Sequence, residues 1–289
     1  MRQAELEGDG QDLECHLPAD MTAAQQTSVA VGDRIAFGPG PNGEPTLMAV
    51  EPRTSTLSRP DPMYRHIERV VAANMDVVVI VVSAKAPPLH PKLIDRYLIA
   101  VQRGGAEPLL CLNKVDQLED ERDRAKTYGK LEPYRQIGLR VVLCSAEQGD
   151  GVDDLRAALG GKRCVFVGHS GVGKSSLLNA LHPELRILTR EVSEGYGRGR
   201  HTTTASQLYA LPNGTEVIDT PGVREFGLWK LRREDVCWYF PEFVDAAEDC
   251  RYTDCSHTHE PQCGVKQALA SGRISHTRYD SYQRILGSL

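Results

Sequence analysis

The sequence feature that most constrains the fold is the glycine-rich stretch GHSGVGKS at Gly168–Ser175, which lies between an apolar run and a helix-like segment. It fits the pattern G-x-x-x-x-G-K-[ST], in which backbone N–H groups surround phosphate oxygens at the start of a helix. The preceding run Cys164–Val167 predicts a strand, and the residues from Ser175 onward predict a helix. This order of strand, loop and helix indicates an α/β domain that binds a nucleotide.

The residue types in this loop suggest separate roles in phosphate binding. Lys174 is expected to reach the terminal phosphates, and the Ser175 hydroxyl is expected to ligate Mg²⁺. The other residues that we expect to contact the nucleotide here are Gly168, His169, Ser170, Gly171, Val172, Gly173 and Ser176.

Unbroken apolar runs elsewhere are typical of buried parallel strands. They lie at Val77–Val82, Leu109–Leu112, Val141–Cys144 and Thr215–Ile218. Helix-like segments at Pro91–Arg103 and Gly151–Leu159 separate some of these runs. The pattern predicts an open α/β sheet, in which ligands bind at the carboxyl ends of the strands.

A base-reading motif follows the strand predicted at Leu109–Leu112. It consists of Asn113, Lys114, Val115 and Asp116, and the Asp116 carboxylate is suited to accept two hydrogen bonds from guanine, which adenine does not offer. Ser145 and Ala146 follow another predicted strand, and a backbone N–H there is expected to face guanine O6. Alone, the first motif also fits a surface turn, but its pairing with a phosphate-binding loop favours a guanine site.

The order of these motifs is unusual, because the base-reading motifs precede the phosphate-binding loop. In an ordinary Ras-type domain they follow it. A compact domain tolerates such a permutation when its original termini lie close together, and Gly160–Lys162 is the expected join. We therefore predict the same sheet as in a Ras-type domain, with the chain termini at a different position in the fold.

Two segments have the character of nucleotide-sensing switches. Asp219 ends a predicted strand and is expected to lie near Mg²⁺, while the N–H of Gly222 is expected to approach the γ-phosphate. Upstream, a basic glycine-rich loop ends in three hydroxyls, of which Thr203 is the preferred Mg²⁺ ligand and Thr202 and Thr204 are alternatives. A solvated loop without a ligand role is the other interpretation.

A cluster of metal-ligand residues lies near the C-terminus. Cys250, Cys255 and Cys263 with either His257 or His259 supply three thiolates and an imidazole, which suit a closed tetrahedral Zn²⁺ site. Buried or disulfide-linked cysteines are the alternative, although disulfides are rare in a reducing compartment. The polar composition of the segment favours a fold that depends on metal.

Taken together, the motif order, GHSGVGKSS, GRHTTT, DTPGVREFGLW and the cysteine cluster resemble the RsgA family of ribosome small-subunit-dependent GTPases. The resemblance implies an OB-fold β-barrel at residues 1–65, a circularly permuted GTPase domain at 66–228 and an α-helical zinc-binding domain at 229–289. It also implies His257 as the fourth zinc ligand. The implied activity is GTP hydrolysis coupled to late maturation of the small ribosomal subunit, whose rRNA the protein would bind.

The position after Gly222, where Ras-type enzymes carry a water-orienting glutamine, is Val223. An apolar side chain does not orient water, so we expect slow intrinsic hydrolysis with stimulation by the subunit. His201 is the nearest candidate within the chain for the missing group. An alternative is a nucleotide-gated RNA-binding scaffold in which hydrolysis is incidental.

The N-terminal region departs from the family pattern. The net charge is −5, and no Lys or Arg precedes Val31–Phe37 in the stretch where the family carries basic residues. The RNA contacts expected instead are Arg34, Arg53, Arg59, Arg65 and Arg69, and the aromatic residues available for base stacking are Phe37 and Tyr64.

No apolar run is long enough to span a bilayer, and the N-terminus lacks the pattern of a signal peptide. We expect a cytoplasmic monomer that binds GTP or GDP and has no membrane partner. A GTPase that acts on a membrane or another protein is the remaining alternative.

Overall fold

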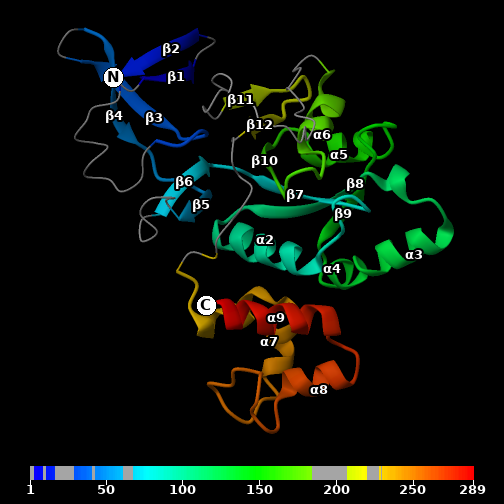
Figure 1. The fold of residues 1–289 in the computed structure, drawn as a ribbon. Coiled ribbons are helices and arrows are strands. Elements are labelled where there is room, and N and C mark those ends of the chain that lie inside the picture. The colour runs from blue at the N-terminus through cyan, green and yellow to red at the C-terminus, as the bar shows by residue number, and fades with distance from the viewer. Residues whose placement is uncertain are drawn as a thin grey trace, which may run out of the picture.

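The computed structural model describes residues 3–8, 11–16, 29–40, 43–60, 68–183, 207–219, 228 and 230–289. A six-stranded sheet with helices on both faces forms the centre of the molecule (Figure 1). The N-terminal strands lie beside one edge of this sheet, and a helical C-terminal module lies beneath one of its helical layers. The α/β fold predicted from the apolar runs is confirmed.

The central sheet is parallel except at one edge. Its strands, in spatial order, are β11 (Gln207–Ala210), β12 (Glu216–Asp219), β10 (Arg163–Val167), β7 (Val77–Ser83), β8 (Glu107–Asn113) and β9 (Arg140–Leu143). Only β11 runs antiparallel to its neighbour within this sheet. The strand that leads into the phosphate-binding loop, β10, therefore lies in the interior of the sheet although it is the fourth of these strands along the chain.

The permutation follows directly from this strand order. The half made of β7, β8 and β9 precedes β10 in sequence, and the half made of β11 and β12 follows it. Helix α5 (Val152–Leu159) and the turn after it join the two halves. Lys162 in this turn donates its backbone N–H to Leu159 and accepts from Glu216, so the join is hydrogen-bonded to the sheet. The predicted join is thus a short ordered connection.

Two hydrophobic cores, one on each face, hold the sheet in place. Strand β7 alternates between them, because Val78, Ile80 and Val82 enter one core and Val77, Val79 and Val81 enter the other. The first core is covered by α2 (Pro91–Arg103) and α4 (Glu132–Gln136), and the second by α5 and α6 (Lys174–Leu181). Burial on both faces explains why these strands are continuous apolar runs.

The segment between β8 and β9 holds further helical elements that the apolar runs did not indicate. They are η1 (Val115–Gln117), α3 (Glu121–Gly129) and α4. Asp120 caps α3 by accepting from the N–H of Asp123 at 2.7 Å. The helix is largely exposed, so its sequence lacks the apolar stripe by which helices are usually detected.

The N-terminal strands form two separate sheets among the described residues. A four-stranded sheet has the order β1 (Gln3–Gly8), β2 (Gln11–His16), β4 (Pro45–Val50) and β3 (Ile35–Pro39), and a two-stranded sheet pairs β5 (Thr56–Pro60) with β6 (Glu68–Ala73). Closure into a barrel is not seen within these residues. The β5–β6 pair links residues on the two sides of the boundary predicted at residue 65, and Thr56 donates its N–H to Gly104 at the end of α2.

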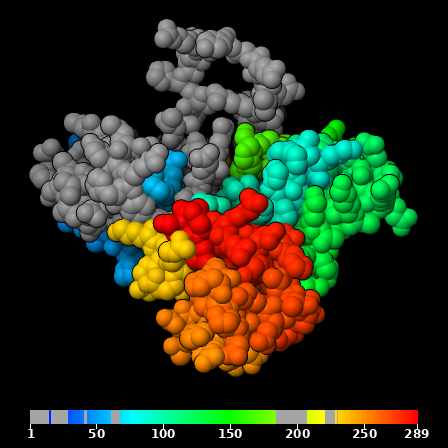
Figure 2. Space-filling model, turned by 60° about the horizontal axis from the view of Figure 1, so that its bottom comes forward, coloured from blue at the N-terminus to red at the C-terminus, as the bar shows by residue number. Residues whose placement is uncertain are grey.

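The C-terminal module is helical, as predicted. It consists of η3 (Arg233–Tyr239), α7 (Pro241–Ala247), α8 (Gly264–Ala270) and α9 (His276–Ser288). Its core is aromatic, with Phe240, Phe243 and Tyr282 in mutual ring contact. Figure 2 shows this module, coloured yellow to red, seated directly against the cyan and green part of the chain.

Candidate guanine-nucleotide site and metal centre

The predicted nucleotide-binding motifs meet at one edge of the sheet through the side chain of Asn113. This residue ends β8 and is buried. Its Nδ2 donates to the carbonyl of Val172 in the phosphate-binding loop at 2.9 Å, and its Oδ1 accepts from the N–H of Ala146 at 3.1 Å. One amide therefore joins three motifs that are well separated in sequence.

Lys114 makes a second connection between the same loops. Its backbone is left-handed, with φ 62°. The ammonium donates to the carbonyl of Gly171 at 2.6 Å and to the carbonyl of Ala86 at 2.7 Å. The base-reading loop is thereby fixed against both the phosphate-binding loop and the segment that leads into α2.

Glycine is required at two positions of the phosphate-binding loop. Gly168 has φ 146°, and a Cβ there would lie 2.2 Å from the carbonyl oxygen of Val81. Gly173 has φ 93°, and a Cβ there would lie 2.2 Å from Nδ2 of Asn113. Any side chain at these two positions would thus displace the strand next to the loop or the amide that organises the site.

The loop leads into α6 at Lys174, which places Ser175 and Ser176 in the first helical turn. The Lys174 ammonium donates to the carbonyls of Gly168 and His169 at 2.8 and 3.0 Å. Its side chain thus folds back over the loop in which phosphate is expected to sit. Backbone N–H groups at the start of a helix favour an anion at the same place.

The two segments predicted to read the base are also joined to each other. The Ser145 hydroxyl donates to Asp116 and accepts from the N–H of Gln148 at 3.0 Å. The N–H of Val115 donates to the carbonyl of Cys144 at 3.1 Å. The Ala146 N–H, expected to face guanine O6, donates to Asn113 in this structure, so its contact with guanine stays a prediction.

Asp219 lies at the end of β12, next to the strand that precedes the phosphate-binding loop. Burial raises the pKa of its carboxyl, and the positive charge of Lys174 opposes this rise. The carboxylate of Asp219 thus experiences the charge of Lys174, the residue that is expected to bind the terminal phosphates. Thr203, His201 and Gly222, with the alternatives Thr202 and Thr204, lie outside the described residues, and their roles stay predictions.

The predicted zinc ligands come together in the C-terminal module. The ligand atoms of Cys250, Cys255, His257 and Cys263 all lie within 4.8 Å of one another. Nδ1 of His257 is 3.5 Å from Sγ of both Cys250 and Cys263, and these two sulfur atoms are 3.9 Å apart. Tetrahedral Zn²⁺ with its usual bond lengths requires about 3.5 Å between sulfur and nitrogen and about 3.8 Å between sulfurs. The donors of Cys250, His257 and Cys263 match these spacings, and that of Cys255 lies within 4.8 Å of them.

The same geometry distinguishes between the two candidate histidines. His257 is buried in the cluster, whereas the side chain of His259 is 85% exposed and its Nδ1 lies 3.0 Å from the Thr258 hydroxyl. Two tyrosines of α9 fix the ligand loop, since Tyr279 donates to the carbonyl of His257 at 2.7 Å and Tyr282 to that of Ser256 at 2.9 Å. The helix thus supports the loop that carries the ligand.

Glu260 is a further residue of this loop, and no sequence motif indicates its role. Its carboxylate accepts from the N–H and hydroxyl of Ser256 at 2.8 and 2.6 Å and from the N–H of Thr258 at 3.0 Å. Burial by itself raises the pKa of Glu260, but these hydrogen bonds outweigh it and lower the pKa to about 2. The charged carboxylate therefore holds both neighbours of His257, whose φ of 59° is unfavourable for a non-glycine residue.

We predict that Glu260→Gln weakens retention of the metal by about 10-fold or more, because an outer-sphere partner typically contributes 10- to 100-fold to metal affinity. The amide is neutral and has only one acceptor oxygen, so it cannot replace the three hydrogen bonds. Competition with a chromogenic chelator measures this change, and Glu248→Gln, an exposed position of the same module, is the control. Equal zinc retention by the two variants would show that Glu260 does not support the site.

Most of the arginines expected to contact RNA already interact within the protein. Arg53 pairs with Asp33, with 2.7 Å between Nε and Oδ1, and both side chains are largely buried. Arg59 and Arg69 are opposite each other in the register of β5 and β6. Arg65 and Tyr64 lie outside the described residues. The ion pair therefore gives Arg53 a packing role, whereas Arg34 and Arg69 are the exposed members of the group among the described residues.

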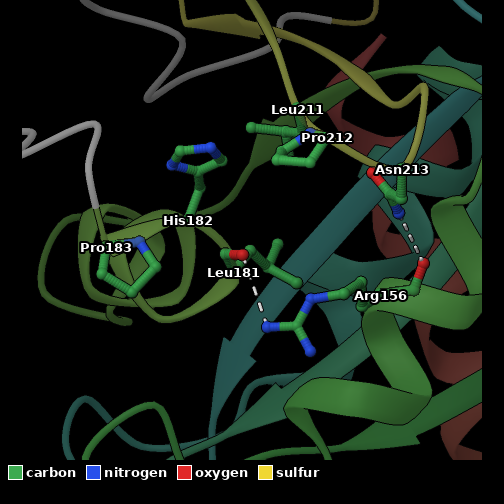
Figure 3. A pocket seen from close by; sticks show the side chains of 7 residues that line it. All are labelled: Arg156, Leu181, His182, Pro183, Leu211, Pro212 and Asn213. Carbon is green, nitrogen blue, oxygen red and sulfur yellow. Dashed lines mark hydrogen bonds between the residues drawn. The ribbon is translucent and has the colours of Figure 1, made fainter.

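A separate hollow of about 370 Å³ lies beside α5, the end of α6 and the turn between β11 and β12 (Figure 3). Its lining residues are Arg156, Leu181, His182, Pro183, Leu211, Pro212 and Asn213. The Arg156 guanidinium is already bonded to the carbonyls of Ala180 and Leu181, both at 3.3 Å. None of these residues belongs to the nucleotide-binding motifs.

The strand order and the loops at its carboxyl edge define a P-loop GTPase with permuted chain order. Comparison with known proteins agrees with this class. The family model described as RsgA GTPase matches residues 50–229. The chain belongs to the RsgA GTPase family and is a GTP hydrolase.

Several relatives cover nearly the whole chain. "Small ribosomal subunit biogenesis GTPase RsgA" of Ectopseudomonas mendocina is 45% identical over 99% of this chain and 82% of that protein. The protein of the same name from Pseudomonas putida is 44% identical over 97% of this chain and 79% of its own length.

Solved structures show the same architecture. YjeQ from Thermotoga maritima matches with a TM-score of 0.78 and 33% identity over 99% of this chain and 93% of its own. YloQ, described as a circularly permuted GTPase, matches with a TM-score of 0.73 and 30% identity over 96% and 86% of the two chains. The predicted permutation is confirmed. In the part of the chain that the structure describes, no helix is long and apolar enough to cross a membrane.

Proposed function

We propose that this protein binds the small ribosomal subunit and its rRNA, assists late steps of subunit maturation, and hydrolyses GTP faster when the subunit is bound. The observation that carries the proposal is the joining of the phosphate-binding and guanine-reading loops by Asn113 and Lys114. The names of the relatives support the ribosomal partner.

In the proposed reaction, the chain supplies binding, orientation and positive charge. Asp116 reads guanine, Lys174 neutralises charge on the terminal phosphates, and the N–H of Gly222 contacts the γ-phosphate. Mg²⁺, held by Ser175 and Thr203 with Asp219 nearby, would stabilise the charge that develops on the phosphate oxygens. His201 or a group of the subunit would orient the attacking water, because Val223 cannot.

The proposed domain organisation places an OB-fold-like RNA-binding domain at residues 1–65, the GTPase domain at 66–228 and the zinc domain at 229–289. The separation of the N-terminal sheet from the central sheet and the Cys₃His cluster of the helical module support it. We propose Zn²⁺ as the resident metal of that cluster, and the protein as a cytoplasmic monomer.

GTP turnover measured with purified small subunits, with large subunits and with neither is the direct test. We expect small subunits to raise the turnover number by at least about 10-fold, since groups supplied by a partner contribute 10³–10⁵ in other GTPases. A Lys174→Ala variant, which lacks the phosphate-binding cation, gives the background rate. Equal turnover under the three conditions would contradict the proposed partner.

The scaffold alternative rests on Val223 and is tested with the same materials. Single-turnover kinetics separate the chemical step from product release. If small subunits bind the GTP-loaded protein but leave the chemical step unchanged, hydrolysis is incidental to binding and the scaffold function is the correct one.

A further inference from the structure

The segment between β7 and α2, residues 84–90, contacts both loops of the nucleotide site. Ala84 donates its N–H to the carbonyl of Asn113 at 2.9 Å. The Ala86 carbonyl accepts from Lys114 at 2.7 Å and from the Ser83 hydroxyl at 2.9 Å. A Cβ at Gly171 would lie 3.8 Å from Cδ of Pro87, which is ordinary van der Waals contact. The segment therefore cannot shift without disturbing both loops.

The helix that follows this segment is buried on two sides. Ile94, Leu98 and Val101 of α2 enter the core that it shares with the sheet, while Ile99 belongs to the core of the C-terminal module. The hydroxyl of Tyr134 donates to the carbonyl of Pro91 at 2.8 Å and fixes the start of the helix. Thus α2 is a structural part of both the GTPase domain and the C-terminal module.

A buried ion-pair network fixes the module onto α2. Arg278 of α9 is 1% exposed, and its guanidinium pairs with the fully buried Asp95 of α2. The same guanidinium binds Glu242 of α7 through two hydrogen bonds of 2.6 and 3.0 Å, and it lies over the ring of Phe240 with its carbon 4.4 Å from the centroid. One side chain thus connects α2, α7 and α9.

The Asp95–Arg278 pair restricts the position of α2 relative to α9. Burial raises the pKa of Asp95, and the positive charge of Arg278 opposes that rise. A buried carboxylate that loses its cation is left in an unfavourable environment, so a displacement of α2 relative to α9 is costly. The buried pair therefore favours a single alignment of the two helices.

We propose that α2 couples the nucleotide site to the C-terminal module, so that guanine-nucleotide binding and seating of the module through Asp95 and Arg278 stabilise each other. The proposal rests on nucleotide binding at the site described above and is independent of any ribosomal partner. Nucleotide that fixes the loops around Lys114 also fixes Ala86 and the start of α2. Reciprocity then requires that a firmly seated module raise nucleotide affinity by the same factor.

Hydrogen exchange of the full-length, metal-loaded protein with and without GDP tests the proposal. In the wild-type protein, GDP should slow amide exchange in α6, which reports binding, and also in α9, which reports coupling. In Arg278→Met, GDP should still protect α6 but should no longer protect α9. The dissociation constant of GDP should rise by about 5-fold or more, the lower end of typical coupling between sites.

Two further variants keep the test decisive. Asp95→Asn preserves the shape of the side chain and removes the charge, so it serves if Arg278→Met does not fold. Arg284→Gln changes an exposed cation of the same helix and should behave as the wild type. Truncation of the module is less informative, because it would expose Ile99 and Asp95.

Each failure has a distinct meaning. Absence of GDP protection in both α6 and α9 of the wild type would overturn the nucleotide site and the coupling together. Protection of α6 without protection of α9 would overturn the coupling alone. Persistent protection of α9 in a folded Arg278→Met or Asp95→Asn variant would show that the signal does not pass through this pair, and would also overturn the proposal.

Discussion

Asp116→Asn is expected to weaken GTP binding by about 10²- to 10⁴-fold and to transfer the preference to xanthosine nucleotides. A site that loses a matched pair of hydrogen bonds to its substrate discriminates on this scale. The introduced amide would meet the guanine donors with a donor of its own, whereas the C2 carbonyl of xanthine can accept from it. The hydrogen bond from the Ser145 hydroxyl should survive the substitution, because the amide oxygen at position 116 can still accept it.

Titration with fluorescent GTP, XTP and ATP analogues measures the change. Asp154→Asn, an exposed aspartate in the first turn of α5, is the matched control and should bind GTP as the wild type does. Unchanged GTP affinity in Asp116→Asn, or equal affinity of the wild type for ATP and GTP, would remove Asp116 from the base-reading role.

Cys263→Ser is expected to abolish tight zinc binding and to unfold the C-terminal module. Structural zinc contributes about 10–16 kcal/mol to the folding of small metal-dependent modules. Cys263 is buried and is the N-cap residue of α8, so the substitution removes a ligand and leaves a hydroxyl in a buried position. The two cores of the central sheet contain no residue of the cluster, so we expect the sheet to remain folded although Ile99 and Asp95 of α2 would lose their partners in the module.

Metal analysis measures the loss of zinc. Near-ultraviolet circular dichroism, to which Tyr279 and Tyr282 contribute, follows the unfolding of the module. Cys237→Ser is the control, because Cys237 belongs to the same module and lies outside the metal cluster. Full wild-type structure in a freshly purified protein that holds well below one zinc per chain would contradict the metal-dependent fold.

Much of this molecule could be predicted from local sequence because its constraints are local. The run Val77–Val82 predicts β7, and helix α2 has the predicted bounds Pro91–Arg103, because burial on both faces requires apolar residues throughout a strand and an apolar stripe on a helix. The phosphate-binding loop could also be predicted locally, because its backbone conformation requires glycine at particular positions. The metal cluster could be predicted in the same way, because ligand geometry restricts the residue types and their spacing.

Exposed and structurally marginal elements were harder to predict. Helix α3 has few buried side chains, so its sequence has no apolar stripe. Its first turn is stabilised by the Asp120 cap. Glu260 lies within the predicted ligand loop, but an acidic residue in a polar loop is usually solvated, and its role depends on the backbone N–H groups that the fold turns toward it.

Residue types at short spacing were enough to indicate the class of ligand, the permuted motif order and a Cys/His metal site, and they predict Asp116 as the base reader. Which residues connect these parts became clear only from the way the chain packs in three dimensions. Asn113 meets Val172 from 59 residues away, and Asp95 meets Arg278 from 183 residues away. Such pairs carry no local periodicity or spacing, since their partners are chosen by how strands and helices pack. For the same reason the structure could distinguish His257 from His259 by burial and distance.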